Sequence, residues 1–96
     1  MVRKEHQLLI YNVITPDGNG LNDTWQIDNI QAYADNRVHI FDQWNKIVFE
    51  QTNYQNDWDG RNQSGELLPP GTYFYQITFT SSKVTYRGYL SLLLTN

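Results

Sequence analysis

The chain has 96 residues, the size of one domain, and on general scaling such a chain buries roughly 60 to 65% of its unfolded surface. This length excludes a two-domain enzyme with a cleft between domains. The net charge of −3, with basic residues scattered along the chain, argues against nucleic-acid binding. Aromatic residues make up 15% of the chain, which favours half-buried strands, so we expect an all-β domain.

The first predicted strands come from apolar runs in the N-terminal third. An almost continuous apolar run over residues 7–14 predicts one strand, which ends at Thr15-Pro16. Residues 17–23 are a loop by composition, because Gly, Asn and Asp dominate them. Residues 24–30 predict a short second strand with Trp25 and Ile27 on one face.

A hairpin is predicted next, with strands over residues 37–42 and 47–50. In the turn between them, Asn45 is the residue expected to take the left-handed backbone conformation. Along the first of these strands, Val38 and Ile40 lie on one apolar face, and the residues between and beside them lie on a second face that is predominantly polar. That second face consists of Arg37, His39 and Phe41.

The C-terminal third carries the clearest alternation. After an irregular connection over residues 57–70, residues 72–80 alternate strictly, with Tyr73 and Tyr75 expected in the core. We expect Phe74, on the opposite face, to be covered by the second sheet or a loop. Residues 84–94 alternate again. Their predicted inward residues are Val84, Tyr86, Leu90, Leu92 and Leu94.

Six or seven short strands separated by turn signals predict an Ig-like antiparallel β-sandwich of about seven short strands. We expect one such domain over residues 8–96, with residues 1–7 as an N-terminal linker or added residues. The absence of cysteine means that packing alone, or packing plus a metal, holds the fold. Neither a signal-peptide pattern nor a long apolar span occurs, so we expect a water-soluble domain.

Charge is distributed unevenly along the chain. All ten acidic residues lie between Glu5 and Glu66, and beyond Glu66 the only charged residues are Lys83 and Arg87. Either the last strands lie in the core and need few charges, or this segment presents a docking surface.

Residues with catalytic chemistry are few, and we expect no enzyme. His39 lies on the polar face of a strand, where an exposed His is ordinary, and the chain has neither a Cys nucleophile nor a G-x-S-x-G motif. Asp57 and Asp59 could be imagined as an acid and a base. Their two-residue spacing beside Gly60 is explained more simply by backbone hydrogen bonds in a turn.

A candidate calcium loop follows the first strand. Calcium prefers six to eight oxygen ligands, and this loop offers the side chains of Asp17, Asn19, Asn22 and Asp23. The loop lacks the distal bidentate Glu of an EF-hand, so a metal-free loop held by Asx-turns is the alternative.

A second group of oxygen-bearing side chains is also a candidate for calcium binding, with a metal-free turn as the alternative. This group consists of Asp57, Asp59 and Asn62.

Two tryptophans are candidates for contacts. Trp58 either stacks on a ligand, as in carbohydrate-binding modules, or plugs the end of the sandwich before the irregular connection. Trp44, at the predicted hairpin tip, is the better candidate for an exposed contact.

Five motifs occur in a fixed order, and an ordered set is far more specific than any single motif. They are T-P-x-G-x-G-x-N-D from Thr15, N-x-V-x-I-F from Asn36, W-x-x-x-V-F-E from Trp44, W-D-G from Trp58 and L-P-x-G-T-Y-F-Y from Leu68. Together they resemble the gliding-motility-associated C-terminal domain, the type B sorting domain of type IX secretion in Bacteroidetes-type bacteria. The chain departs from the family in its loop, where the acid more often stands at the position of Asn19 and Asn at that of Asp17.

The resemblance implies a C-terminal sorting domain that directs a larger protein through the periplasm to the cell surface or the medium. The implied partners are the type IX translocon and a PorP/SprF-type outer-membrane protein, without a small-molecule substrate. We expect partner contacts through Trp44, Arg87 and Tyr89, at the hairpin tip and on the outward face of the last strand. The alternative is an adhesion or carbohydrate-binding β-sandwich whose exposed Trp and Tyr stack on sugar.

Overall fold

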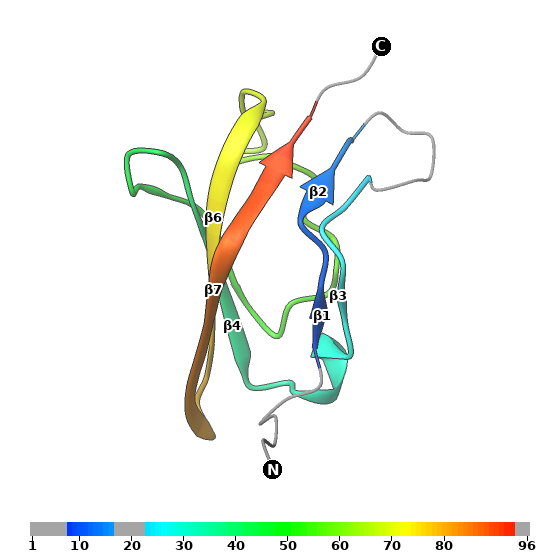
Figure 1. Ribbon diagram of the computed structural model, residues 1–96, viewed down its shortest axis with the longest axis vertical. Coiled ribbons are helices and arrows are strands. Elements are labelled where there is room, and N and C mark those ends of the chain that lie inside the picture. The colour runs from blue at the N-terminus through cyan, green and yellow to red at the C-terminus, as the bar shows by residue number, and fades with distance from the viewer. Residues whose placement is uncertain (1–7, 17–22, 94–96) are drawn as a thin grey trace.

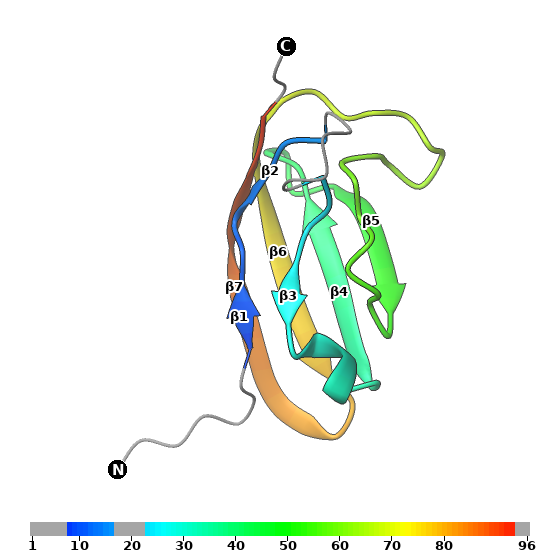
Figure 2. The same cartoon turned by 90° about the vertical axis from the view of Figure 1, so that its right-hand side faces the viewer.

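Two β-sheets packed face to face make up the computed structural model, which describes residues 8–16 and 23–93 (Figures 1 and 2). The larger sheet has the strand order β2-β7-β6-β4-β5, and the smaller sheet pairs β1 with β3. This confirms the predicted all-β sandwich. The elements are β1 (Leu9–Ile10), β2 (Val13–Ile14), β3 (Ile27–Asp28), the 3-10 turn η1 (Ile30–Ala32), β4 (Asn36–Phe41), β5 (Ile47–Thr52), β6 (Gly71–Phe79) and β7 (Ser82–Leu92).

The first apolar run changes sheets within a few residues. β1 pairs antiparallel with β3, whereas β2 pairs in parallel with β7. Between them, the Tyr11 N–H donates to the Gln26 carbonyl over 3.1 Å, and the Asn12 carbonyl accepts from the Ser91 N–H over 2.8 Å. The single strand predicted over residues 7–14 is therefore wrong, because an apolar run does not specify which sheet it joins.

The second predicted strand is shorter than expected. Only Ile27 and Asp28 of residues 24–30 pair in a sheet, and Asn29, with φ of 73°, turns the chain into η1. The predicted faces are nevertheless right, because Trp25 and Ile27 are both fully buried.

The core lies between the two sheets and draws on the inward residues of β4, β6 and β7. Burial of each Leu- or Phe-sized side chain stabilises the fold by about 1.5 to 3 kcal/mol. The buried hydrophobic residues are Ile14, Trp25, Ile27, Ile30, Val38, Ile40, Val48, Tyr54, Trp58, Tyr73, Ile77, Phe79, Leu90 and Leu92.

An irregular connection over residues 53–70 completes the smaller layer beside β3 (Figure 2). Its anchor is Tyr54, whose hydroxyl donates to the Trp25 carbonyl over 2.8 Å and accepts from the Trp58 N–H over 2.9 Å. The side chain of buried Asn36 accepts from the Tyr54 N–H over 2.9 Å and donates to the Tyr33 carbonyl over 2.7 Å. Buried side-chain hydrogen bonds thus replace a strand ladder in this layer.

The described part of the chain contains no helix that is long and apolar enough to cross a bilayer.

Candidate functional site

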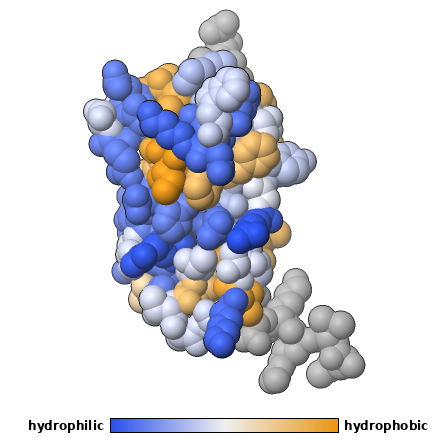
Figure 3. Space-filling model, turned by 90° about the vertical axis from the view of Figure 1, so that its left-hand side faces the viewer, coloured by the Kyte–Doolittle hydropathy of each residue, from blue (hydrophilic) through white to orange (hydrophobic). Residues whose placement is uncertain are grey.

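The outer face of the five-stranded sheet carries a row of apolar side chains across four strands. The strand register places Phe41 beside Ile47 on one side and Phe74 on the other, and Phe74 beside Tyr89. Phe74 is 45% exposed and Tyr89 is 54% exposed. The expectation that Phe74 is covered was wrong, because the smaller layer packs against the opposite face of this sheet. Figure 3 views the outer face, whose broadest hydrophobic area lies in the upper half.

Phe41, Phe74 and Tyr89 of this row line an open groove of about 530 Å³, which we call the aromatic groove. Two of the three predicted partner-binding residues, Arg87 and Tyr89, line it together. Sequence reasoning missed Phe41 and Phe74 as site residues, although an aromatic side chain on an otherwise polar strand face was a usable signal. The groove is lined by Phe41, Asn45, Phe74, Tyr75, Gln76, Arg87, Gly88 and Tyr89.

Trp44, the third predicted contact residue, lies in the turn of the hairpin between β4 and β5 and is 85% exposed. The Asp42 carboxylate holds this tip by accepting from the N–H groups of Trp44, over 2.8 Å, and Lys46, over 3.0 Å. Asn45 has φ of 64°, which confirms the predicted left-handed turn. Trp44 lines a separate cleft of about 260 Å³ with Pro69 and Pro70, whereas its chain neighbour Asn45 lines the aromatic groove.

Polar side chains form the next row across the same sheet face. His39 pairs with Glu50 on one side and Gln76 on the other, and Gln76 pairs with Arg87. The His39 Nε2 lies 3.8 Å from Glu50 Oε1, and the imidazole stacks on the Phe41 ring with centroids 6.2 Å apart. The His39 side chain is 18% exposed, so the expectation of an exposed histidine was wrong.

Tyr73 and Tyr75 both stay neutral phenols at neutral pH. Burial raises the pKa of Tyr73, and the nearby Asp42 carboxylate raises it further. Burial also raises the pKa of Tyr75, which packs on Trp25 with ring centroids 5.2 Å apart.

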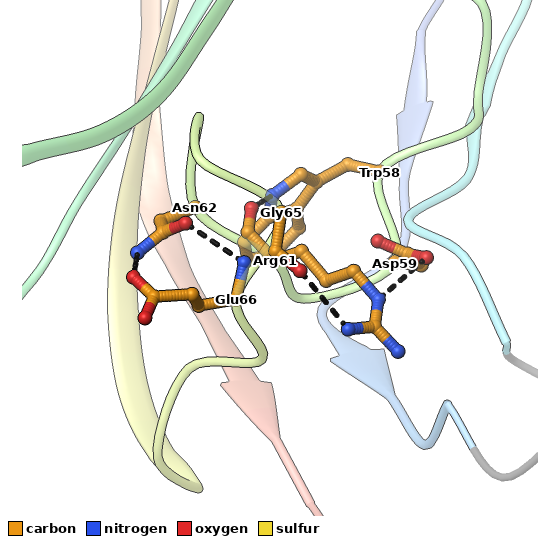
Figure 4. Close-up of polar contacts among 6 residues, drawn as sticks. All are labelled: Trp58, Asp59, Arg61, Asn62, Gly65 and Glu66. Atoms are coloured by element: carbon orange, nitrogen blue, oxygen red, sulfur yellow. Dashed lines mark hydrogen bonds and ion pairs between the residues drawn. The ribbon is translucent and has the colours of Figure 1, made fainter.

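Trp58 is 2% exposed and closes one part of the core, as the plug interpretation predicts. Its Nε1–H donates to the Arg61 carbonyl over 2.8 Å (Figure 4). A side chain this buried has no face left for stacking on a sugar.

The turn after Trp58 uses its polar side chains to hold the backbone. The Asn62 Oδ1 accepts from the N–H groups of Ser64, over 2.9 Å, and Glu66, over 3.0 Å. Asp59 Oδ2 lies 3.4 Å from Arg61 Nε, on the other side of the turn (Figure 4). These contacts fit the interpretation of this segment as a hydrogen-bonded turn.

Of the four candidate calcium ligands, only Asp23 belongs to the described residues; Asp17, Asn19 and Asn22 lie outside them. Within residues 8–16 and 23–93, no three His, Asp or Glu side chains gather in a way that could hold a metal ion.

A β-sandwich with an open aromatic groove on one sheet face has the features of a protein-recognition module. Residues 8–92 match the family described as the CHU_C type IX secretion signal domain, and the chain belongs to that family. This confirms the predicted family and its sorting role: the domain is a signal that directs the protein containing it through the type IX secretion system, toward the cell surface or the medium.

Among solved structures, the chain is similar to part of PorZ, an essential bacterial surface component of the type IX secretion system of Porphyromonas gingivalis. The TM-score is 0.66 at 19% sequence identity, and the match covers 90% of this chain but 11% of the PorZ chain. This likeness shows the fold alone. Among curated protein sequences, none matches this chain.

Proposed function

We propose that this signal is read as a folded surface by the type IX translocon and a PorP/SprF-type outer-membrane protein, after the passenger has crossed the periplasm. The domain works by recognition and catalyses no reaction. The observation that carries the proposal is the exposure of Phe74 and Tyr89 beside Arg87 on an uncovered sheet face.

The composition of the aromatic groove suits a protein partner. Removing apolar surface from water is favourable by about 25 cal/mol per Å². A partner that covers Phe74 and Tyr89 therefore binds more tightly, because it removes their apolar surface from water. Aromatic residues and Arg also dominate the hot spots of protein interfaces, and Arg87 adds a charge that orients the partner. Membership of a secretion signal family supports this function over the adhesion alternative.

The proposal is tested with a fluorescent passenger fused upstream of the domain in a type IX-competent cell. Arg87→Glu and Tyr89→Ser alter the groove at exposed positions, so each changes the free energy of unfolding by about 0.5 kcal/mol or less. Surface delivery of the passenger is expected to fall about tenfold or more, the change that corresponds to a loss of 1.4 kcal/mol in binding.

Arg37→Glu is the matched control. Arg37 is exposed on the same sheet face, in the row of Thr52 and Thr78, and does not line the groove. The Arg37→Glu variant should deliver the passenger to the surface at nearly the wild-type level. Equal loss in the Arg37 and Arg87 variants would mean that net charge, and not the groove, governs delivery.

A further inference from the structure

One edge of the larger sheet is open along most of β7. β6 pairs with β7 along one side, whereas β2 pairs on the other side with Ser91 and Leu92 alone. In the part of the chain that the structure describes, no strand lies against this edge over residues 82–90. The opposite edge of the sheet is partly closed, because the Glu50 N–H of β5 donates to Gln63 Oε1 over 2.8 Å.

The open edge exists because the N-terminal segment turns away from it. The register that places Val13 beside Ser91 would, if continued backwards, place Tyr11 beside Tyr89 and Leu9 beside Arg87. Instead, Leu9 pairs with β3 in the smaller sheet. Figure 2 shows β1 in front of β7, in the other layer. The sheet therefore has room for one more strand beside residues 82–90.

The backbone of β7 presents hydrogen-bonding groups to this vacant position. The N–H groups of Ser91 and Leu93 donate to the Asn12 and Ile14 carbonyls, so both point to the β2 side. Successive residues of a strand direct their backbone groups to alternate sides. The N–H and C=O groups of Arg87 and Tyr89 therefore point to the same open edge.

The side chains of β7 define the chemistry that fits this edge. Lys83 and Arg87 are exposed on the outward face, and the chain has no acidic residue after Glu66. Val84 and Tyr86, on the inward face, are only half-buried. A strand added here would meet two cations on one face and an apolar surface on the other.

We infer that this edge of β7 receives an extended strand of the outer-membrane partner, in which acidic residues on the outward face alternate with apolar residues on the inward face. Strand addition uses backbone hydrogen bonds for affinity and alternate side chains for specificity. The inference rests on the proposed function and specifies how the partner binds.

Replacement of one edge-facing N–H tests the inference. Arg87→Pro removes the edge-facing donor of Arg87 and keeps the ladder to β6, whereas Arg87→Thr removes the same side chain and keeps the donor. In the passenger assay, the Pro variant should deliver at least tenfold less passenger than the Thr variant. Equal delivery by the two variants overturns strand addition. If both fall equally below wild type, recognition through the groove still stands.

A second measurement applies to the unmodified domain and is independent of any effect of proline on folding. Amide hydrogen exchange is followed by mass spectrometry with outer-membrane vesicles from a type IX-competent strain, and with vesicles from a strain lacking the system. Exchange over residues 86–90 should slow at least tenfold with the first vesicles only, and residues 47–52 on the other edge should not change. Unchanged exchange over residues 86–90, or protection confined to residues 47–52, overturns the inference.

Discussion

The Tyr75 hydroxyl lies directly over Gly88, its partner across the β6–β7 ladder. A Cβ placed on Gly88 would lie 2.5 Å from the Tyr75 Oη and 2.7 Å from its Cζ, closer than real side chains approach. The Tyr75 ring also packs on the buried Trp25, with centroids 5.2 Å apart, so it cannot swing aside without disturbing the core. The missing side chain of Gly88 thus lets Tyr75 contact both Trp25 in the core and β7, which lines the aromatic groove.

Gly88→Ala should therefore lower the free energy of unfolding by about 1 to 3 kcal/mol, the usual cost of overpacking. Chemical denaturation measures this cost. In a Tyr75→Ala background the same change should cost less, because the clash is gone. An equal cost in both backgrounds would show that Tyr75 is not the cause.

Tyr54→Phe should destabilise the domain by about 1 to 3 kcal/mol, because it leaves the Trp25 carbonyl and the Trp58 N–H without their partner in a buried region. Tyr89→Phe is the matched control, since Tyr89 is 54% exposed and its loss of a hydroxyl should change stability by about 0.5 kcal/mol or less. Similar denaturation midpoints for the two variants would contradict the role given to the Tyr54 hydroxyl.

Gly71 begins β6 with φ of 150°, a backbone conformation that residues with a Cβ rarely adopt. Gly71→Val should lower the free energy of unfolding by about 1 to 3 kcal/mol through backbone strain. A Cβ here would meet only Gln43 Nε2, at an ordinary 3.6 Å, so Gly71→Ala should cost nearly as much as Val. A harmless Ala variant beside a damaging Val variant would indicate crowding and not strain.

Calcium is proposed for the loop over residues 17–23, on the strength of its oxygen-bearing side chains. A bound ion stabilises the folded state by mass action, so the melting temperature should rise with Ca²⁺ from micromolar to millimolar concentration, and chelator should reverse the rise. Asn22→Ala within the loop should weaken this response. Identical melting curves in excess Ca²⁺ and in EDTA would leave the metal-free Asx-turn loop in its place.

Sequence periodicity predicted which residues enter the core but not how the sheets are assembled. The strict alternation of β6 placed Tyr73 and Ile77 inside correctly, because side-chain direction in a strand has a period of two residues. The sheet change at Tyr11 and Asn12 was not predictable, since both halves of that apolar run are equally able to pair. The exposure of Phe74 was missed for a related reason: it depends on which sheet face the smaller layer covers.

The site was predictable in part. An outward position for Arg87 and Tyr89 followed from the alternation of β7, and exposure of Trp44 followed from its place in a hairpin turn. The groove itself depends on the register that brings Phe41, Phe74 and Tyr89 into one row. Phe74 and Tyr89 lie in one hairpin, whose turn sets their register, whereas Phe41 joins the row only through the pairing of β4 with β6, two strands that are not consecutive in the chain.

Delivery of a passenger tests the sorting role most directly. A fluorescent protein with a periplasmic signal peptide is expressed in a type IX-competent cell with and without residues 8–96 fused at its C-terminus, and surface exposure is read by accessibility to an external protease. We expect the fusion to reach the surface or the medium and the passenger alone to stay in the periplasm. Equal surface delivery with and without the domain would contradict the sorting role.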